Sequence, residues 1–210
     1  MCSSDLERLS ADSYICALPF ERLAAVGLPA PKLEHSPITG IHLWFDREIT
    51  DLDHAILLDS TIQWMFHKSR LQAEKRRGEP GSYVELVVSA SKSLVGMGRQ
   101  EIIDVALREL AEFFPLVAQA KLLKAAVVKE VRATYSIRPQ LDLLRPSSLS
   151  PWPRVFLAGD WIATGWPSTM EGAVRSGYLA AEAVSRAAGK PASFLQADLA
   201  AAGLMRLLSK

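Results

Sequence analysis

The segment 155–177 constrains the possible fold and function of this chain more than any other segment. A short apolar run from Val155 to Ala158 leads into a turn rich in glycine and proline, followed by a stretch of small residues. We expect a buried strand, a turn and a helix in that order, because small side chains let a helix approach a strand closely. A helix that begins here would present free N–H groups and its positive dipole end, which suit an anion or an electron-rich ring edge.

The residues of the turn allow a more detailed prediction. The run Ser168-Thr169-Met170-Glu171 is typical of a capping box, with Ser168 as the N-cap and Glu171 reaching back to the cap amide. Asp160, at the carboxyl end of the strand, can accept hydrogen bonds from sugar hydroxyls. Each residue also has a plainer interpretation: Asp160 could be a surface residue, the small residues could serve packing alone, and Trp166 suits packing and ligand contact equally.

The same segment resembles the C-terminal FAD-binding motif of flavin amine oxidases and carotenoid-type desaturases. In that motif an apolar strand, Gly-Asp, a Thr-Gly-x-Pro turn and a Gly-Ala-x-x-Ser-Gly helix follow one another, as they do over 155–177. The stretches 36–50, 61–69 and 83–94 are similar to the squalene-associated FAD-dependent desaturases, which are hydroxysqualene dehydroxylases of hopanoid biosynthesis.

The resemblance implies an FAD-dependent oxidoreductase that converts hydroxysqualene, an isoprenoid, to squalene. It places Asp160 at the ribityl chain and the Met170 amide near the pyrimidine edge of the flavin. The residues expected to bind the cofactor are Gly159, Asp160, Trp161, Gly165, Pro167, Ser168, Thr169, Met170 and Gly172. Those expected to line an apolar substrate tunnel are Trp44, Gln63, Trp64, Phe66 and Trp166. For the aromatic residues on the strands, a place in an ordinary core is the plainer interpretation. No side chain is assigned to catalysis.

Hydrophobic periodicity predicts the remaining elements. Expected are a buried strand at 12–18, a short helix at 20–28, antiparallel strands between 38 and 93 with a loop at 67–82, an amphipathic helix at 99–114, a strand at 122–136 and an amphipathic helix at 194–208. In the strand Gly40–Asp46, alternation puts Ile41, Leu43 and Phe45 on one face and His42 and Trp44 on the other.

We therefore expect an α/β plus α+β fold, the C-terminal part of a two-domain FAD-linked oxidoreductase. Its antiparallel sheet would bind substrate, and a partial Rossmann-like domain would bind FAD. The expected boundaries are 1–35 for a late strand of the FAD domain, 36–140 for the substrate domain, 141–190 for the return to the FAD domain, and 191–210 for a C-terminal helix.

The glycine-rich loop that usually holds the FAD pyrophosphate is not found in the sequence. The nearest candidate, Gly96-Met97-Gly98, has Glu101 at the third glycine position, and an ordinary turn that caps the next helix is the better interpretation. We therefore expect a C-terminal fragment of a longer enzyme, or a domain that is inactive without an N-terminal half.

Composition and residue spacing bear on which ligands the chain can bind. The net charge of +1, from 24 basic and 23 acidic residues, gives no case for nucleic-acid binding. Neither the two cysteines nor the four histidines have the spacing of a metal site. A cytoplasmic protein is expected, with peripheral contact to the inner membrane face through 194–208 as one option. The alternatives within enzymes are a phytoene-type carotenoid desaturase and a flavin amine oxidase.

Overall fold

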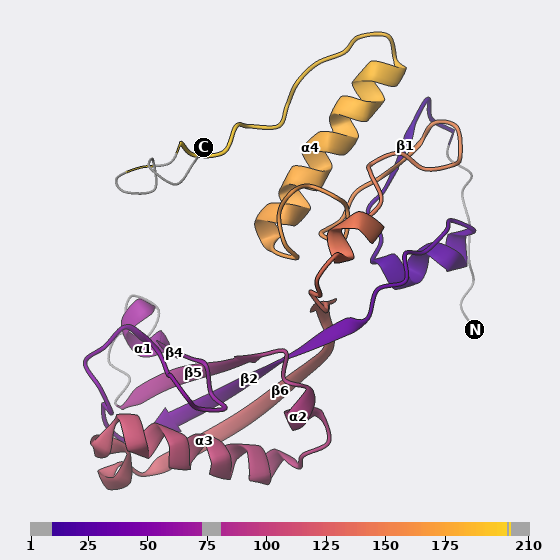
Figure 1. Cartoon of the computed structure of the whole chain (residues 1–210). Coiled ribbons are helices and arrows are strands. Elements are labelled where there is room, and N and C mark those ends of the chain that lie inside the picture. Colours follow the sequence, from indigo (N-terminus) through magenta and orange to yellow (C-terminus); the bar gives the residue numbers. More distant parts are fainter. Residues whose placement is uncertain (1–9, 73–80, 201, 203–210) are drawn as a thin grey trace. The chain divides into compact units, whose positions relative to one another are not determined.

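The computed structural model of the chain describes residues 10–72, 81–200 and 202. The chain divides into two compact units, one formed by Glu34–Ser136 and the other by Met1–Leu33 with Ile137–Lys210. Helices and sheets occur in both units, and the larger sheet is antiparallel (Figure 1). The fold is therefore a mixed one of the α/β class, and each unit is described by itself.

The unit Glu34–Ser136 is built on a five-stranded sheet in the order β3-β4-β5-β2-β6. All neighbouring strands are antiparallel. The strands are β2 (His35–Phe45), β3 (His54–Ile56), β4 (Trp64–His67), β5 (Ser82–Ser89) and β6 (Leu122–Tyr135). The long strand β2 pairs with β5 on one side and with β6 on the other, so both of its edges are hydrogen-bonded within the sheet.

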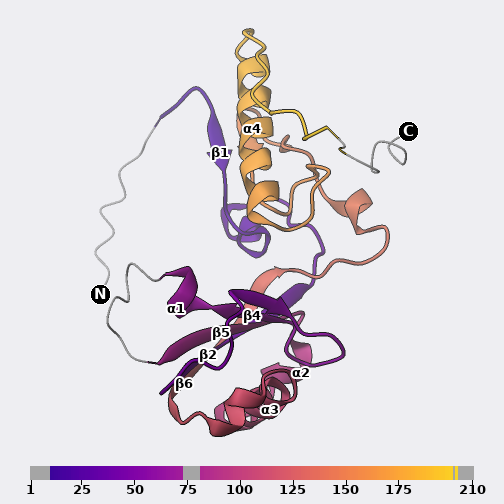
Figure 2. The same ribbon diagram turned by 90° about the vertical axis from the view of Figure 1, so that its left-hand side faces the viewer.

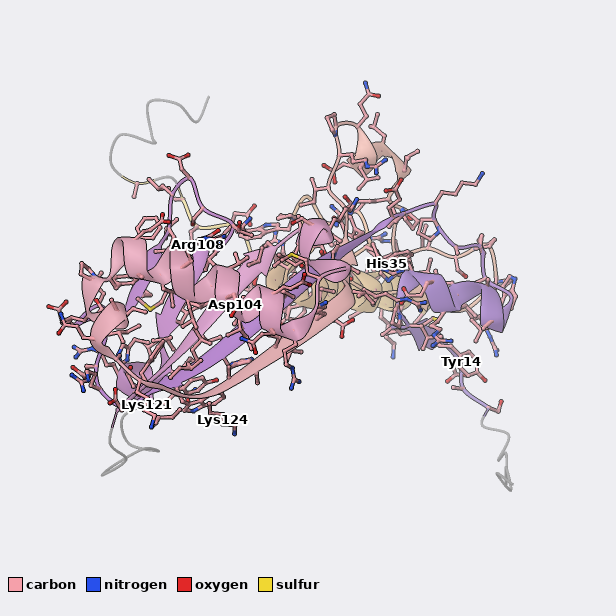
Figure 3. The ribbon with its side chains drawn as sticks, turned by 90° about the horizontal axis from the view of Figure 1, so that it is seen from below. Tyr14, His35, Asp104, Arg108, Lys121 and Lys124 are labelled. Carbon is pink, nitrogen blue, oxygen red and sulfur yellow. The ribbon has the colours of Figure 1, made fainter. Side chains whose placement is uncertain are left out.

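One face of this sheet is covered by α3 (Arg99–Phe113), which lies along it in Figure 2. The predicted alternation in β2 is confirmed: Ile41, Leu43 and Phe45 are buried in the core. They pack in one cluster with apolar residues of α3, which include Ile102, Ile103, Ala106 and Leu110. The outer side of this helix is polar, and Figure 3 shows its exposed residues Asp104 and Arg108.

Several details of this unit differ from the sequence-based prediction. β2 begins at His35, not at residue 38, because the strand accommodates Pro37 at a break in its register with β6. β3 was not predicted, since its three residues are too few to show alternation. The predicted loop 67–82 holds a short helix, α1 (Lys68–Leu71), and its residues 73–80 lie outside the described part.

The turn Gly96-Met97-Gly98 caps the start of α3, as expected from the sequence. After a short helix, α2 (Lys92–Val95), the chain turns at Gly98, whose N–H donates to the Glu101 carboxylate at 2.5 Å. This bond satisfies one of the amides that a helix start leaves open. A 3-10 turn, η3 (Pro115–Gln119), follows α3 and leads into β6.

The other unit contains a two-stranded parallel sheet of β1 (Tyr14–Cys16) and β7 (Val155–Leu157). The remaining elements are η1 (Phe20–Val26), η4 (Leu141–Leu144) and α4 (Met170–Ala187). A small core joins Phe156 and Ala158 to Ala180 and Ala183 of α4. The alanines permit the close contact between helix and strand that the sequence indicated.

Two predictions for this unit need correction. The strand at 12–18 is short and not buried, since the side chains of Tyr14 and Ile15 are 40% and 49% exposed. The predicted helix at 194–208 is not formed in residues 194–200, and most of the rest lies outside the described residues. The Glu182 carboxylate instead accepts the N–H groups of Phe194 and Leu195, at 2.8 and 2.9 Å. These bonds tie the non-helical residues Phe194 and Leu195 to α4, and they lower the pKa of Glu182.

Candidate functional site

The candidate site lies in the second unit, where β7 ends and α4 begins. Gly159 follows the strand with φ of +147°, a conformation that side chains rarely permit. A Cβ atom here would lie 2.3 Å from Nε1 of Trp161. The Gly159 N–H donates to Oγ of Ser176 at 2.7 Å, which ties the strand end to the helix. Glycine is required at this position because a side chain would collide with the Trp161 ring and because other residues rarely adopt this φ.

The helix is capped one residue later than predicted. Oγ1 of Thr169 accepts the N–H of Gly172 at 3.1 Å, so Thr169 is the N-cap. The hydroxyl of Ser168 donates instead to the Asp160 carboxylate, and Glu171 pairs with Arg175 at 3.4 Å rather than with the cap amide. The capping box on Ser168 is therefore wrong, because the carboxylate eight residues earlier competes for its hydroxyl.

Gly172 sits where the helix start meets the turn. A Cβ at this position would lie 2.5 Å from the carbonyl oxygen of Pro167, so only glycine lets the first helical turn approach this closely. The N–H groups of Met170 and Glu171 have no acceptor among the described residues. Two free amides, the positive dipole end of α4 and the Asp160 carboxylate thus form one polar edge. Such an edge fits the carbonyl-bearing edge of a flavin and its ribityl hydroxyls.

Arg145, which sequence reasoning missed, holds this turn in place. Its side chain is only 1% exposed. The guanidinium donates to the carbonyl oxygens of Trp166 at 2.7 Å and Asp160 at 3.1 Å, and also to that of Ile162. Both ends of the turn are therefore bound to one side chain. No sequence pattern marked this residue, since it lies in a Pro-rich stretch without hydrophobic periodicity.

The two tryptophans of the turn have different surroundings. Trp161 is buried, and its indole N–H donates to the carbonyl oxygen of Leu18 at 3.1 Å, so its side chain is not available to a cofactor. Trp166 is 37% exposed. Its indole N–H donates to Asp198 at 3.3 Å, and the Arg175 guanidinium lies 5.4 Å from its ring centroid. Gly165 has φ of +77° and leaves open space around its Cα.

Three of the residues expected to line a substrate tunnel share one face of the larger sheet. Trp44 lies opposite Tyr83, Phe66 opposite Glu85, and Trp64 opposite Val87. Because Tyr83, Glu85 and Val87 alternate along β5, their partners point to the same side. This is the face away from α3, and we call it the aromatic face. Trp44 stacks on Tyr83 with 4.5 Å between ring centroids, and Trp64 stacks on Phe66 at 5.8 Å.

The other predicted lining residues lie elsewhere. The amide of Gln63 is bonded to the main chain of Ser89, accepting its N–H at 2.9 Å and donating to its carbonyl at 3.4 Å. The structure thus gives Gln63 a role in joining β4 to β5. Trp166 belongs to the other unit.

Polar groups also occur on the aromatic face. Nδ1 of His42 lies 2.8 Å from the Tyr83 hydroxyl, and the Lys68 ammonium lies 2.9 Å from the Glu85 carboxylate. The ammonium of Lys124, labelled in Figure 3, stands 4.7 Å from the Trp44 ring centroid. The pairing with Glu85 raises the pKa of Lys68 above its ordinary value. Alternation along the strand had placed His42 on one face with Trp44, whereas its partner Tyr83 gave no signal as an individual residue.

A metal-binding cluster of three or more histidine, cysteine or acidic residues does not occur in the described part of the chain. Among the same residues, no helix has the length and apolar character needed to cross a membrane.

Comparisons with known proteins place this geometry in a family. Residues 2–185 match the family described as flavin containing amine oxidoreductase. The chain is 30% identical over 211 residues to 15-cis-phytoene desaturase of Synechococcus elongatus, covering 90% of this chain and 44% of that protein. It is 31% identical over 174 residues to hydroxysqualene dehydroxylase of Sinorhizobium fredii, covering 81% of this chain and 38% of that protein. The chain thus spans less than half the length of these curated relatives.

Solved structures show the same fold. Reduced UDP-galactopyranose mutase matches with a TM-score of 0.60 at 15% identity, over 89% of this chain and 43% of that one. Putrescine oxidase with bound putrescine matches with a TM-score of 0.53 at 12% identity, over 84% of this chain and 42% of that one. With the family match over most of its length, the chain belongs to the flavin-containing amine oxidoreductases, the superfamily that includes the carotenoid-type desaturases.

Proposed function

We propose that this chain is the C-terminal part of an FAD-dependent enzyme that reductively dehydroxylates hydroxysqualene to squalene. The observation that carries the flavin part of the proposal is the turn between β7 and α4. At Gly159 and Gly172 a side chain would clash with the Trp161 ring and the Pro167 carbonyl oxygen, and the N–H groups of Met170 and Glu171 have no acceptor among the described residues. These features fit a flavin, whose reduced ring carries negative charge that helix amides stabilise.

Each part of this chain has a defined task in the proposed reaction. Reduced FAD, when bound, would supply the hydride that replaces the hydroxyl group and would itself be oxidised, while the hydroxyl group takes up a proton and leaves as water. Asp160 would bind the ribityl hydroxyls, and the amides of Met170 and Glu171 would hydrogen-bond the ring edge. The aromatic face would hold the isoprenoid chain and exclude water from the reacting carbon. Trp44, Trp64 and Phe66 supply the apolar surface for this.

A phytoene-type desaturase is the second candidate. It is favoured by the curated relatives named 15-cis-phytoene desaturase, among them that of Solanum lycopersicum at 33% identity over 198 residues. That protein is covered to 34% and this chain to 86%. Both candidates use flavin and an isoprenoid, but one reduces an alcohol and the other oxidises a hydrocarbon.

We also propose that an N-terminal half supplies the pyrophosphate-binding loop. Parallel strands are normally covered on both faces, yet β1 and β7 form a two-stranded parallel sheet with exposed apolar side chains. On α4, Val174 and Tyr178 are 54% and 43% exposed. A further set of strands and helices would cover these residues. The proposed location is the cytoplasm, with peripheral contact to the inner membrane face, since the substrate is insoluble in water.

The first experiment is purification of residues 1–210 and measurement of visible absorbance with and without added FAD. The glycine-rich loop contributes much of the affinity for a dinucleotide, so the chain alone is expected to keep little flavin. The assembled enzyme, with the upstream half restored, is expected to hold about one FAD per chain. It should then form squalene from hydroxysqualene under reducing conditions. Desaturation of phytoene with no squalene formed would support the second candidate, and an assembled enzyme without flavin would refute both.

A further inference from the structure

We infer that His42 and Tyr83 form a polar subsite that binds the hydroxyl group of an isoprenoid alcohol. The inference rests on the proposed function and deepens it, because it names which of two substrate classes the aromatic face accepts. A hydrocarbon needs no hydrogen-bonding partner anywhere along its length. An alcohol needs one at a single position on an otherwise apolar surface.

The geometry provides one such position. His42 and Tyr83 are bonded through Nδ1 and the phenol oxygen at 2.8 Å, and Tyr83 is itself stacked on Trp44. The imidazole lies 6.2 Å from the Trp44 ring, measured between centroids, so the polar pair is part of the aromatic face. The imidazole is therefore held by its bond to Tyr83 and by its position beside the stacked rings of Trp44 and Tyr83.

The second ring nitrogen of His42 is the group left for a ligand. Nε2 has no hydrogen-bond partner among the described residues. It lies above Gly40, 3.5 Å from where a Cβ would stand, so no side chain of that residue covers it. Neutral imidazole has one donor and one acceptor nitrogen, and the bond with Tyr83 permits either assignment. A hydroxyl group can donate or accept, so it pairs with Nε2 in both cases.

The neighbouring charges do not compete for this nitrogen. Glu85 lies opposite His42 on β5, but its carboxylate is paired with Lys68 at 2.9 Å. Ala126 of β6, on the other side of His42, is apolar. The Lys124 ammonium stands over the Trp44 ring instead, 4.7 Å from its centroid. A neutral oxygen such as that of an alcohol therefore suits the subsite. A bound hydrocarbon would instead cover Nε2 without giving it a partner, which costs binding energy.

The test compares two C15 compounds, farnesol and the corresponding triene without the hydroxyl group. Binding to the 210-residue chain and to the assembled enzyme is followed by ¹⁹F NMR of 5-fluorotryptophan, with the Trp44 signal assigned by W44F. His42→Phe removes Nε2 and keeps a ring, and Tyr83→Phe removes the hydroxyl and keeps the stacking on Trp44. Phe66→Leu is the matched control, because it changes the same face without removing a polar group.

His42→Phe should weaken farnesol binding by about tenfold and leave triene binding unchanged. Tyr83→Phe should weaken farnesol binding less, and Phe66→Leu should weaken both compounds alike. An equal effect of His42→Phe on the two compounds, or no binding of either, would overturn the inference. If farnesol binds through His42 but hydroxysqualene is not reduced, the subsite stands and the proposed reaction fails. If hydroxysqualene is reduced and His42→Phe has the wild-type kcat/KM, the reaction stands and the subsite fails.

Discussion

Arg145 shows how much of the candidate site depends on one buried side chain. Its guanidinium binds three main-chain carbonyl oxygens of the turn, and replacing it would leave those oxygens without this donor. Arg145→Met should lower the free energy of unfolding by about 2–4 kcal/mol. Urea denaturation followed by circular dichroism measures this.

Asp142→Ala is the matched control for Arg145. Asp142 accepts from the same guanidinium at 2.8 Å, but its side chain is 86% exposed, so the pair is screened by water. We expect this variant to lose less than about 0.5 kcal/mol. A loss as large as that of Arg145→Met would mean that the ion pair, not the carbonyl bonds, stabilises the turn.

His67 predicts a dependence of stability on pH. It is buried at the end of β4, and desolvation lowers its pKa below the ordinary value of 6.5. As pH falls below about 6.5, the unfolded chain takes up a proton that the folded chain refuses, so stability decreases until the lowered pKa is reached. Nδ1 of His67 accepts the Arg70 N–H at 3.3 Å, and asparagine can replace that acceptor.

The variant His67→Asn should therefore show a shallower loss of stability than wild type between pH 7 and the lowered pKa. Urea unfolding at several pH values gives the slopes, and NMR titration of the His67 ring gives its pKa directly. A wild-type slope in the variant would assign the pH dependence to other groups.

At the scale of elements, the start of α4 decides the shape of the site. Thr169→Ala removes the acceptor for the Gly172 N–H and should cost about 1 kcal/mol, whereas Thr169→Ser should restore most of it. Thermal unfolding of the two variants measures the difference. Equal stability of the alanine and serine variants would contradict the assignment of Thr169 as the cap.

The glycines of the same helix provide a second, sharper comparison. Gly172→Ala puts a Cβ 2.5 Å from the Pro167 carbonyl oxygen and should push the helix start away from the turn. Gly177→Ala meets nothing within 4 Å and should stabilise the helix by up to about 1 kcal/mol. Opposite signs in urea denaturation are expected. Flavin content of the assembled enzyme should fall for Gly172→Ala only.

At the scale of the whole molecule, the proposed N-terminal half would cover apolar side chains that are exposed in this chain alone. Ile15 and Val174 carry exposed apolar side chains in the second unit. Replacing both with serine should reduce aggregation of the isolated chain and weaken its association with the upstream half. Light scattering and co-purification measure the two effects. Unchanged co-purification would show that this surface does not take part in assembly.

The sequence by itself determined several of the local elements and the family. Alternation identified the buried face of β2, the helical repeat identified α3, and segment 155–177 indicated a strand, a turn and a helix. These features depend on neighbours within a few residues, so they are visible in one stretch of chain. The resemblance drawn from the same segment agrees with the family match over residues 2–185.

Only the tertiary structure decided which side chains meet. Arg145 reaches the turn because the chain folds back on itself, and Trp161 is buried because Leu18, far away in sequence, lies beside it. The Ser168 hydroxyl is taken by Asp160, which moves the cap to Thr169. The pairing of His42 with Tyr83 likewise requires the register of β2 against β5. Contacts between distant residues follow from how elements pack, and a single sequence carries no local signal for them.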